Sequence, residues 1–188
     1  MRDDAGVKQL TGLDATFLYM ETPTTYGHVS SIAIYERPDD ANFDPLIAAR
    51  EMVESHLDIA EPYRRRLVGT PLGIDRPYWI EDPDFDLDYH VRHMSLPQPG
   101  TDEQLAEQVA RIQSRHCDRT RPLWELYVIE GLESGDFAVL TKMHHATVDG
   151  AAGAILTTMM LDTEPDAPLA VPGPLPDKEP VPSERDMF

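Results

Sequence analysis

The feature that most constrains this chain is a pair of closely spaced strand candidates, the second of which runs directly into two adjacent histidines. Residues 123–130 and 137–143 are rich in apolar and β-branched side chains, and the turn between them contains two glycines. A hairpin is the simplest arrangement, although strands from elsewhere in the sheet could lie between them. The second candidate ends at His144 and His145. We therefore expect a sheet that carries titratable side chains at the end of a buried strand.

Further patterns predict helices and additional strands. Residues 27–35 alternate in polarity and are rich in β-branched side chains, which is typical of a strand. An Asp-Pro pair resembles a helix N-cap followed by proline at the first helical position, and a Thr-x-x-Gln capping box stands further along the chain. These signals, with the apolar periodicity that follows them, predict helices over 44–57, from 101 to about 116, and from about 150 to 161. A short strand is expected at 78–80. The mixture predicts an α/β fold.

The composition excludes several classes of protein. A length of 188 residues with 41% apolar content is enough for one globular domain. A formal charge of −18 repels phosphate backbones, so nucleic acid is not expected as a partner. The single cysteine, Cys117, allows neither an internal disulfide nor a cysteine zinc cage. The sequence shows no secretory signal and no apolar run long enough to cross a bilayer. We expect a cytoplasmic protein that contacts lipid, if at all, peripherally at a membrane or lipid droplet.

The chain divides into a folded part and a proline-rich end. Seven of the 17 prolines lie after Glu164, where the apolar periodicity also stops. Such a segment is typical of an extended linker. We expect one domain over 1–164 and a proline-rich linker or tail over 165–188.

The segment from His144 to Gly150, with the sequence HHATVDG, is the strongest candidate for chemistry. Side chains alternate along a strand, so His144 and His145 should face opposite ways and only one can enter a given cleft. Histidine suits general-base catalysis because its ordinary pKa lies near neutral pH. Asp149 could turn back to hold an imidazole or an arginine. Against this, paired histidines are often surface residues and Asp-Gly is often a plain turn; a metal site is disfavoured because no third ligand has the expected spacing.

The same segment resembles the HHxxxDG signature of the chloramphenicol acetyltransferase and condensation-domain superfamily. Four further stretches narrow the resemblance to the bacterial wax ester synthase/acyl-CoA:diacylglycerol acyltransferases. They are an opening motif at 10–17 (LTGLDATF), a PLW block at 118–125 (DRTRPLWE), and the segments at 85–92 and 96–100. The resemblance runs from residue 9 to about 164. The sequence departs from the family at His116 and Cys117, which are more polar than usual there and affect packing more than mechanism.

The resemblance implies a mechanism. His145 would take the proton from the acceptor hydroxyl, and the alkoxide would attack the thioester of acyl-CoA, which is a co-substrate; no cofactor and no metal is implied. His144 would have a supporting role. Asp149 would be structural, paired with Arg119 or Arg121. Close to the site stand Gly150, which allows close packing, and the PLW residues Pro122, Leu123 and Trp124.

The resemblance also implies the architecture: a chloramphenicol acetyltransferase-like domain with a mixed sheet flanked by helices, one half of a two-domain enzyme. The product would be triacylglycerol or wax ester, made from diacylglycerol or a fatty alcohol. The expected partner is a carboxy-terminal acyltransferase domain or its separate chain, with self-association as a further possibility. Two alternatives stay open. One is a non-catalytic half-domain that binds lipid or a partner; the other is an acyltransferase with a different alcohol acceptor. The presence of His145, Asp149 and Gly150 favours an enzyme.

Other features have plainer interpretations. The basic triplet Arg64 to Arg66 could meet phosphates of coenzyme A, but acidic residues at 81–88 offer enough partners to favour a structural or solvated role. Trp79 and Trp124 are expected in the core, and Cys117 is expected to be a buried small apolar residue.

Overall fold

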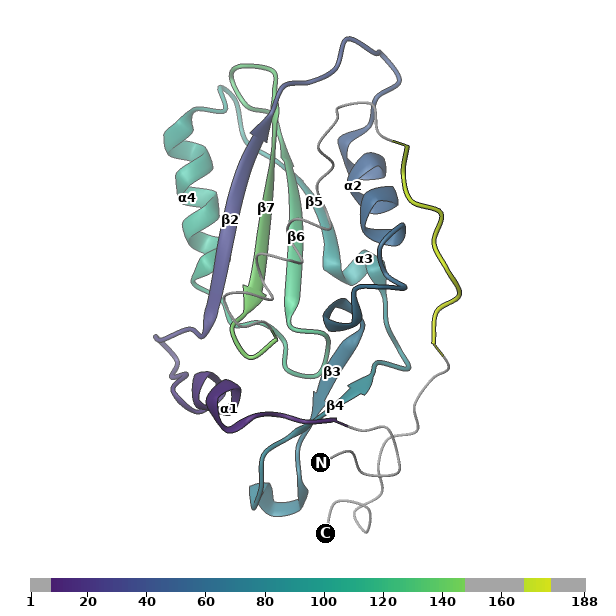
Figure 1. Cartoon of the computed structure of the whole chain (residues 1–188). Coiled ribbons are helices and arrows are strands. Elements are labelled where there is room, and N and C mark those ends of the chain that lie inside the picture. Colours follow the sequence, from purple (N-terminus) through teal and green to yellow (C-terminus); the bar gives the residue numbers. More distant parts are fainter. Residues whose placement is uncertain (1–7, 148–167, 177–188) are drawn as a thin grey trace.

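The computed structural model describes residues 8–147 and 168–176, which form two β-sheets with helices packed against them (Figure 1). The larger sheet has the strand order β2 (His28–Tyr35), β7 (Phe137–His144), β6 (Trp124–Glu130), β5 (Val91–Ser95). The smaller sheet has the order β1 (Lys8–Gln9), β4 (Tyr78–Glu81), β3 (Arg65–Val68). The α-helices are α1 (Gly12–Tyr19), α2 (Pro45–Glu54), α3 (Leu87–His90) and α4 (Asp102–Gln113), and 3-10 turns stand at Glu61–Tyr63 and Pro71–Gly73. The predicted α/β class is confirmed.

Strands β6 and β7 form the predicted antiparallel hairpin, with Trp124 opposite Met143. Strand β2 lies antiparallel along the other edge of β7 and pairs His28 with His144. Strand β5 is parallel to β6, which makes the sheet mixed. This register brings the beginning of β2 next to the paired histidines.

The two faces of the larger sheet pack against different helices, which lie on opposite sides of it in Figure 1. The face toward α2 contributes alternate residues of the central strands to a core of Ala49, Val53, Leu57, Val91, Trp124, Leu126, Val128 and Phe137. The face toward α4 contributes the others, in a core of Leu96, Leu105, Ile112, Tyr127, Ile129, Leu132, Ala138 and Leu140. The period of two along each strand thus divides one sheet between two apolar clusters.

Two of the three predicted helix starts lie in the described residues, and both are confirmed by their caps. The Asp44 carboxylate accepts hydrogen bonds from the backbone N–H groups of Leu46 and Ile47, at 2.8 and 3.1 Å. Thr101 and Gln104 form a reciprocal capping box at the start of α4. Local sequence signals therefore position the beginning of each helix.

Helix α4 ends at Gln113, earlier than the predicted 116, and the reason is tertiary. The Lys142 Nζ of β7 donates to the carbonyl oxygens of Ile112 at 3.3 Å and Arg115 at 2.5 Å. The His28 Nε2 of β2 donates to the Gln113 carbonyl at 2.9 Å. Side chains of the sheet thus satisfy carbonyl groups at the end of α4 and just after it. Helix α2 likewise ends before the predicted residue 57.

The region expected to be mostly turns contains more structure than predicted. Strand β4 confirms the short strand at 78–80, but β3 was not predicted because its first two residues are arginines. Both arginines form ion pairs with acidic residues at the end of β4 or just after it: Arg65 with Glu81 at 3.3 Å and Arg66 with Asp82 at 3.2 Å. The neighbouring Arg64 is buried against Glu81 at 3.1 Å. The structural interpretation of the arginine triplet is confirmed.

Several predictions fall on residues that the structure does not describe. The helix expected over 150–161 and the domain boundary after 164 lie outside the described ranges. Residues 168–176 contain neither helix nor strand, and the Gly173 N–H donates to the Asp58 carboxylate at 2.8 Å. Within the described ranges, no helix has the length and apolar character needed to span a membrane.

His90, at the end of α3, is a buried titratable residue of the core. Its ring stacks on Trp124, with 4.4 Å between the centroids, and on Phe85 at 5.3 Å. Its Nδ1–H donates to the Trp124 carbonyl at 2.8 Å. Burial lowers the pKa of His90 to about 4. The ring is therefore neutral at pH 7.

We expect His90 to make the fold sensitive to acid. Its pKa is about 4 in the folded chain and 6.5 ordinarily, so the unfolded chain binds the proton first as the pH falls. The stability is fully present above about pH 6.5 and is lost toward pH 4, by about 2 kcal/mol between pH 7 and pH 5. His90→Phe keeps an aromatic ring in the stack and removes the titration. Urea unfolding should therefore show a smaller loss of stability between these pH values in the variant; equal losses would contradict the expectation.

Candidate functional site

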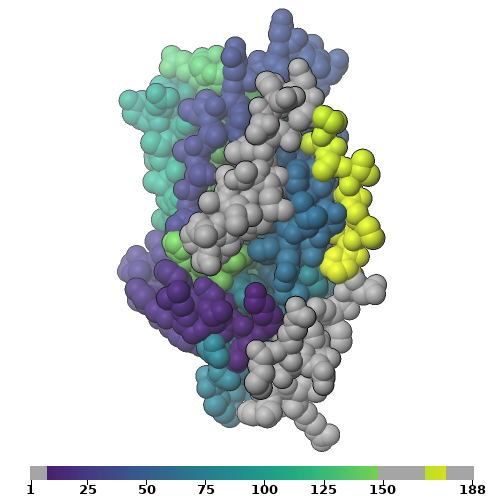
Figure 2. All heavy atoms as spheres, in the orientation of Figure 1, coloured from purple at the N-terminus to yellow at the C-terminus, as the bar shows by residue number. Residues whose placement is uncertain are grey.

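The two histidines at the end of β7 lie in different environments. The His144 side chain is 1% exposed and points into the protein, whereas the His145 side chain is partly exposed. The His145 ring stacks on Phe17 of α1, with 4.6 Å between centroids and 17° between planes. In Figure 2 the amino-terminal residues, in purple, lie against the green surface around the end of β7. Of the two histidines, His145 is therefore the one with a solvent-accessible ring.

The surroundings of His144 fix its protonation. Its backbone N–H donates to the Leu123 carbonyl at 2.9 Å, and its ring Nδ1 accepts from the Ala146 N–H at 3.0 Å. Burial lowers its pKa to about 4, against the influence of Glu21, so the ring is neutral at pH 7. Since Nδ1 accepts a hydrogen bond, the ring proton is on Nε2. That atom lies 3.2 Å from the Glu21 carboxylate, as an electrostatic contact rather than a hydrogen bond of good geometry.

Glu21, which the sequence did not single out, lies at the centre of this arrangement. One carboxylate oxygen accepts the Gly27 N–H at 2.9 Å, and the other accepts Arg119 Nη2 at 2.6 Å. Burial acts to raise the pKa of Glu21, but the hydrogen bonds from Gly27 and Arg119 outweigh it and the pKa is lowered. One signal was present in the sequence: Glu21 is the only acidic residue between Asp14 and Glu36 of a strongly acidic chain.

Gly27, just before β2, contacts both His144 and His145. Its carbonyl accepts the His145 N–H at 2.7 Å. A Cβ added to Gly27 would lie 2.6 Å from Nε2 of His144 and 2.9 Å from the Phe17 carbonyl, distances that real Cβ atoms essentially never show. The approach of β2 to the histidine pair therefore requires a residue without a side chain.

The PLW residues Pro122, Leu123 and Trp124 are buried next to the end of β7. Pro122 and Leu123 are fully buried, and the Leu123 carbonyl is the partner of the His144 N–H. Trp124 is 2% exposed, and its indole N–H donates to the Tyr63 carbonyl at 2.9 Å. The expectation that both tryptophans belong to the core is confirmed, with Trp79 9% exposed. Through the Leu123 carbonyl, this block is bonded to the end of β7.

The aspartate pairing stays a prediction, because Asp149 and Gly150 lie outside the described residues. Arg119 already pairs with Glu21 and also donates to the Leu18 carbonyl at 2.7 Å. The Arg121 guanidinium lies over the Tyr89 ring, 4.4 Å from its centroid.

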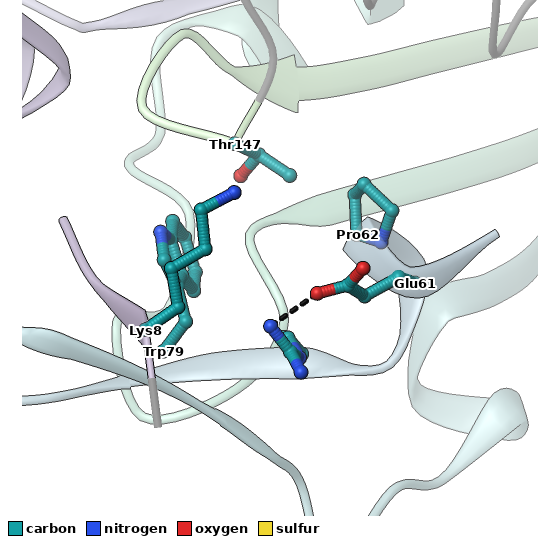
Figure 3. Close-up of a pocket in the computed structure, with 6 residues that line it drawn as sticks. Lys8, Glu61, Pro62, Trp79 and Thr147 are labelled. Atoms are coloured by element: carbon teal, nitrogen blue, oxygen red, sulfur yellow. Dashed lines mark ion pairs between the residues drawn. The ribbon is translucent and has the colours of Figure 1, made fainter. Parts of the chain in front are cut away.

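A small pocket opens beside the turn that follows the histidines. It has a volume of about 100 Å³ and is lined by Lys8, Glu61, Pro62, Arg65, Trp79 and Thr147. Figure 3 shows the Lys8 side chain reaching toward Thr147 and a dashed line at Glu61, which forms an ion pair with Arg65. Sites for drug-sized ligands measure roughly 300–1,000 Å³. This pocket is therefore too small to hold a long acyl chain.

Cys117 does not provide an alternative nucleophile. Its side chain is 5% exposed, which confirms the expected buried position, and burial raises the pKa of its thiol to about 12. A thiol must be deprotonated to attack a carbonyl. Over the described part of the chain, no group of three or more His, Cys, Asp or Glu residues could hold a metal ion.

The profile of the wax ester synthase/diacylglycerol acyltransferase catalytic domain matches residues 10–186. A protein of Mycobacterium tuberculosis, named a probable diacylglycerol O-acyltransferase, is 40% identical over 157 residues, which are 83% of this chain and 57% of the relative. Another protein of that organism, named for the same activity, is 37% identical over 183 residues, which are 97% of this chain and 38% of the relative. The chain thus spans only part of the length of these relatives.

Solved structures agree with this grouping. The wax ester synthase/diacylglycerol acyltransferase of Marinobacter aquaeolei superimposes with a TM-score of 0.74 and 33% identity, over 88% of this chain and 39% of that chain. The first condensation domain of the calcium-dependent antibiotic synthetase gives a TM-score of 0.63 at 15% identity, over 84% of this chain and 38% of that chain. The second likeness shows a shared fold, and the predicted resemblance to chloramphenicol acetyltransferase-like and condensation domains is confirmed at that level.

We expect Gly27→Ala to disturb the site and destabilise the fold. The added methyl group must displace His144 or the Phe17 carbonyl, and overpacking of this kind costs about 1–3 kcal/mol. Gly12→Ala is the matched control, because a Cβ at Gly12, at the start of α1, meets nothing within 4 Å. Thermal unfolding of both variants checks the expectation. A Gly27→Ala variant as stable as Gly12→Ala would show that the close approach is not required.

Proposed function

Because the chain belongs to the wax ester synthase/diacylglycerol acyltransferase family, we propose that it supplies the histidine-bearing part of an acyl-CoA-dependent O-acyltransferase. The acyl acceptor is diacylglycerol or a long-chain alcohol, and the product is triacylglycerol or a wax ester. The matching relatives are named for diacylglycerol acylation and for wax ester synthesis. The observation that carries the proposal is the placement of His145: its backbone is fixed to Gly27, and its ring is partly exposed at the end of β7.

In the proposed reaction His145 is the general base. It removes the proton from the acceptor hydroxyl as the oxygen attacks the thioester carbonyl of acyl-CoA. The tetrahedral intermediate collapses with cleavage of the carbon–sulfur bond, and the proton held by His145 passes to the departing thiolate of coenzyme A. Atoms and charges balance without a cofactor.

The two histidines take different roles because their environments differ. His144 is buried, and its Nδ1 is occupied by the Ala146 N–H, so it is not available to a hydroxyl group. His145 has a partly exposed ring beside Phe17. Direct transfer needs no covalent acyl-enzyme, which fits the buried, protonated thiol of Cys117.

The alternative of a non-catalytic, lipid-binding half-domain has less support. A binding module has no need for a histidine whose backbone is hydrogen-bonded in place and whose ring stays accessible. The other alternative, an enzyme with a different alcohol acceptor, uses the same base and differs only in the acceptor channel. Since the acceptors are membrane lipids or fatty alcohols, we place the reaction at a membrane or lipid-droplet surface.

The proposed enzyme needs a second, carboxy-terminal domain, carried on the same chain or on a separate one. The chain spans 57% and 38% of the two relatives described above. Apolar side chains are also exposed along β2, with exposed fractions of 44% for Val29 and Ile32 and 55% for Ile34. Exposed apolar side chains grouped on one edge are typical of an interaction surface.

We expect His145→Ala in the complete enzyme to lower kcat by roughly 10²–10⁴-fold, the usual contribution of a general base. The melting temperature and the affinity for acyl-CoA should change little. His144→Ala should lower kcat less. His93→Ala, a partly exposed histidine paired with Glu130, serves as the control and should be silent. Wild-type turnover by His145→Ala at saturating substrate would refute the assignment.

We expect residues 1–188 alone to have negligible acyltransferase activity. A general base supplies only part of a rate enhancement, and much of the rest comes from positioning both substrates and excluding water. The assay uses long-chain acyl-CoA with diacylglycerol or a fatty alcohol, before and after addition of the remaining part of the enzyme. The isolated part should also tend to self-associate. Robust turnover by a monomer of residues 1–188 would contradict the two-domain proposal.

A further inference from the structure

We propose that Glu21 is a positioning residue that holds His145 in its catalytic orientation through Gly27. The inference rests on the proposed role of His145 as the base. Glu21 lies between α1 and β2 and does not touch His145 directly. Glu21 acts on the position of His145 through the Gly27 backbone and through the neighbouring ring of His144.

Gly27 connects Glu21 to His145 by two backbone hydrogen bonds. Its N–H is held by the Glu21 carboxylate at 2.9 Å, and its carbonyl holds the His145 N–H at 2.7 Å. A residue bonded on both sides in this way cannot move without moving His145. Because His145 is the first residue after β7, its backbone lacks the protection of the strand interior. The hydrogen bond to Gly27 therefore holds the His145 backbone, and the stack on Phe17 holds its ring.

The ring of His144 provides a second link. Its Nε2–H lies 3.2 Å from the same Glu21 oxygen that accepts from Gly27. The ring also fills the space that a side chain at Gly27 would occupy. Glu21 thus fixes the position of Gly27 and of the histidine packed against it.

Arg119 keeps Glu21 in place. The Glu21 side chain is 4% exposed, whereas the Arg119 side chain is 48% exposed. Arg119 Nη2 donates to both Glu21, at 2.6 Å, and the Leu18 carbonyl, at 2.7 Å. The arginine therefore anchors the carboxylate to the end of α1, the helix that also supplies Phe17 to the His145 ring.

The test is Glu21→Gln in the complete enzyme. Both carboxylate oxygens accept hydrogen bonds, one from Gly27 and one from Arg119. An amide has only one acceptor oxygen, so one of these donors must lose its partner although the shape of the side chain is kept. We expect kcat to fall about 10- to 100-fold, since a displacement near 1 Å can cost about 100-fold. KM for acyl-CoA should change less than about threefold, because Glu21 does not touch substrate.

Glu130→Gln is the matched control. Glu130 also joins an arginine and a histidine, Arg37 and His93, but on the opposite end of the sheet from His145. It should leave kcat unchanged. A kcat of Glu21→Gln within twofold of wild type, or an equal loss in Glu130→Gln, would overturn the proposal.

A second readout separates this inference from the proposed function. Amide hydrogen exchange should accelerate at Gly27 and His145 in Glu21→Gln, by tenfold or more, while the most protected amides of β6 and β7 exchange as in wild type. Uniform acceleration, or none at these two amides, would refute the positioning role even if His145 is the base. If His145→Ala is fully active but the local exchange effect appears, the link between Glu21 and His145 stands and the catalytic role of His145 fails.

Discussion

The structure of the site depends on the close approach of the beginning of β2 to the end of β7. The antiparallel register pairs His28 with His144. The preceding residue, Gly27, therefore contacts both the His144 ring and the His145 backbone. Only a residue without a side chain fits there, since a Cβ would lie 2.6 Å from the His144 ring. The Gly27 N–H donates to the Glu21 carboxylate, and the Gly27 carbonyl accepts from the His145 N–H. Gly27 therefore connects Glu21 to the backbone of His145.

The close approach of β2 to β7 also gives His144 and His145 different environments. His144 is enclosed, neutral at pH 7 and hydrogen-bonded at Nδ1, so it acts as a structural spacer. His145, the next residue, keeps a partly exposed ring against Phe17. Separate environments of neighbouring titratable groups are a recurring way to divide structural from catalytic roles. Here the difference arises where β7 ends, because His144 is its last residue and His145 lies in the turn that follows.

The sequence predicted what local signals determine. Strand β2, the hairpin of β6 and β7 and the starts of α2 and α4 depend on consecutive residues and were all confirmed. The parallel pairing of β5 with β6 and the early end of α4 at Lys142 depend on residues far apart in the chain, which no local pattern shows. In the site, alternation predicted that the histidines face opposite ways but not which is buried. Glu21 carried only the weak signal of an isolated acid, because its role depends on Gly27 and Arg119 folding around it.

The central claim is that His145 meets the acceptor hydroxyl. It is tested most directly by the structure of the complete enzyme bound to an unreactive acyl-CoA analogue and an acceptor alcohol. The distance between the acceptor oxygen and the nearer ring nitrogen of His145 should be about 2.6–3.2 Å, the reach of a general base. His144 should stay enclosed beside Glu21. An acceptor oxygen out of reach of His145, or in contact with a different base, would contradict the claim.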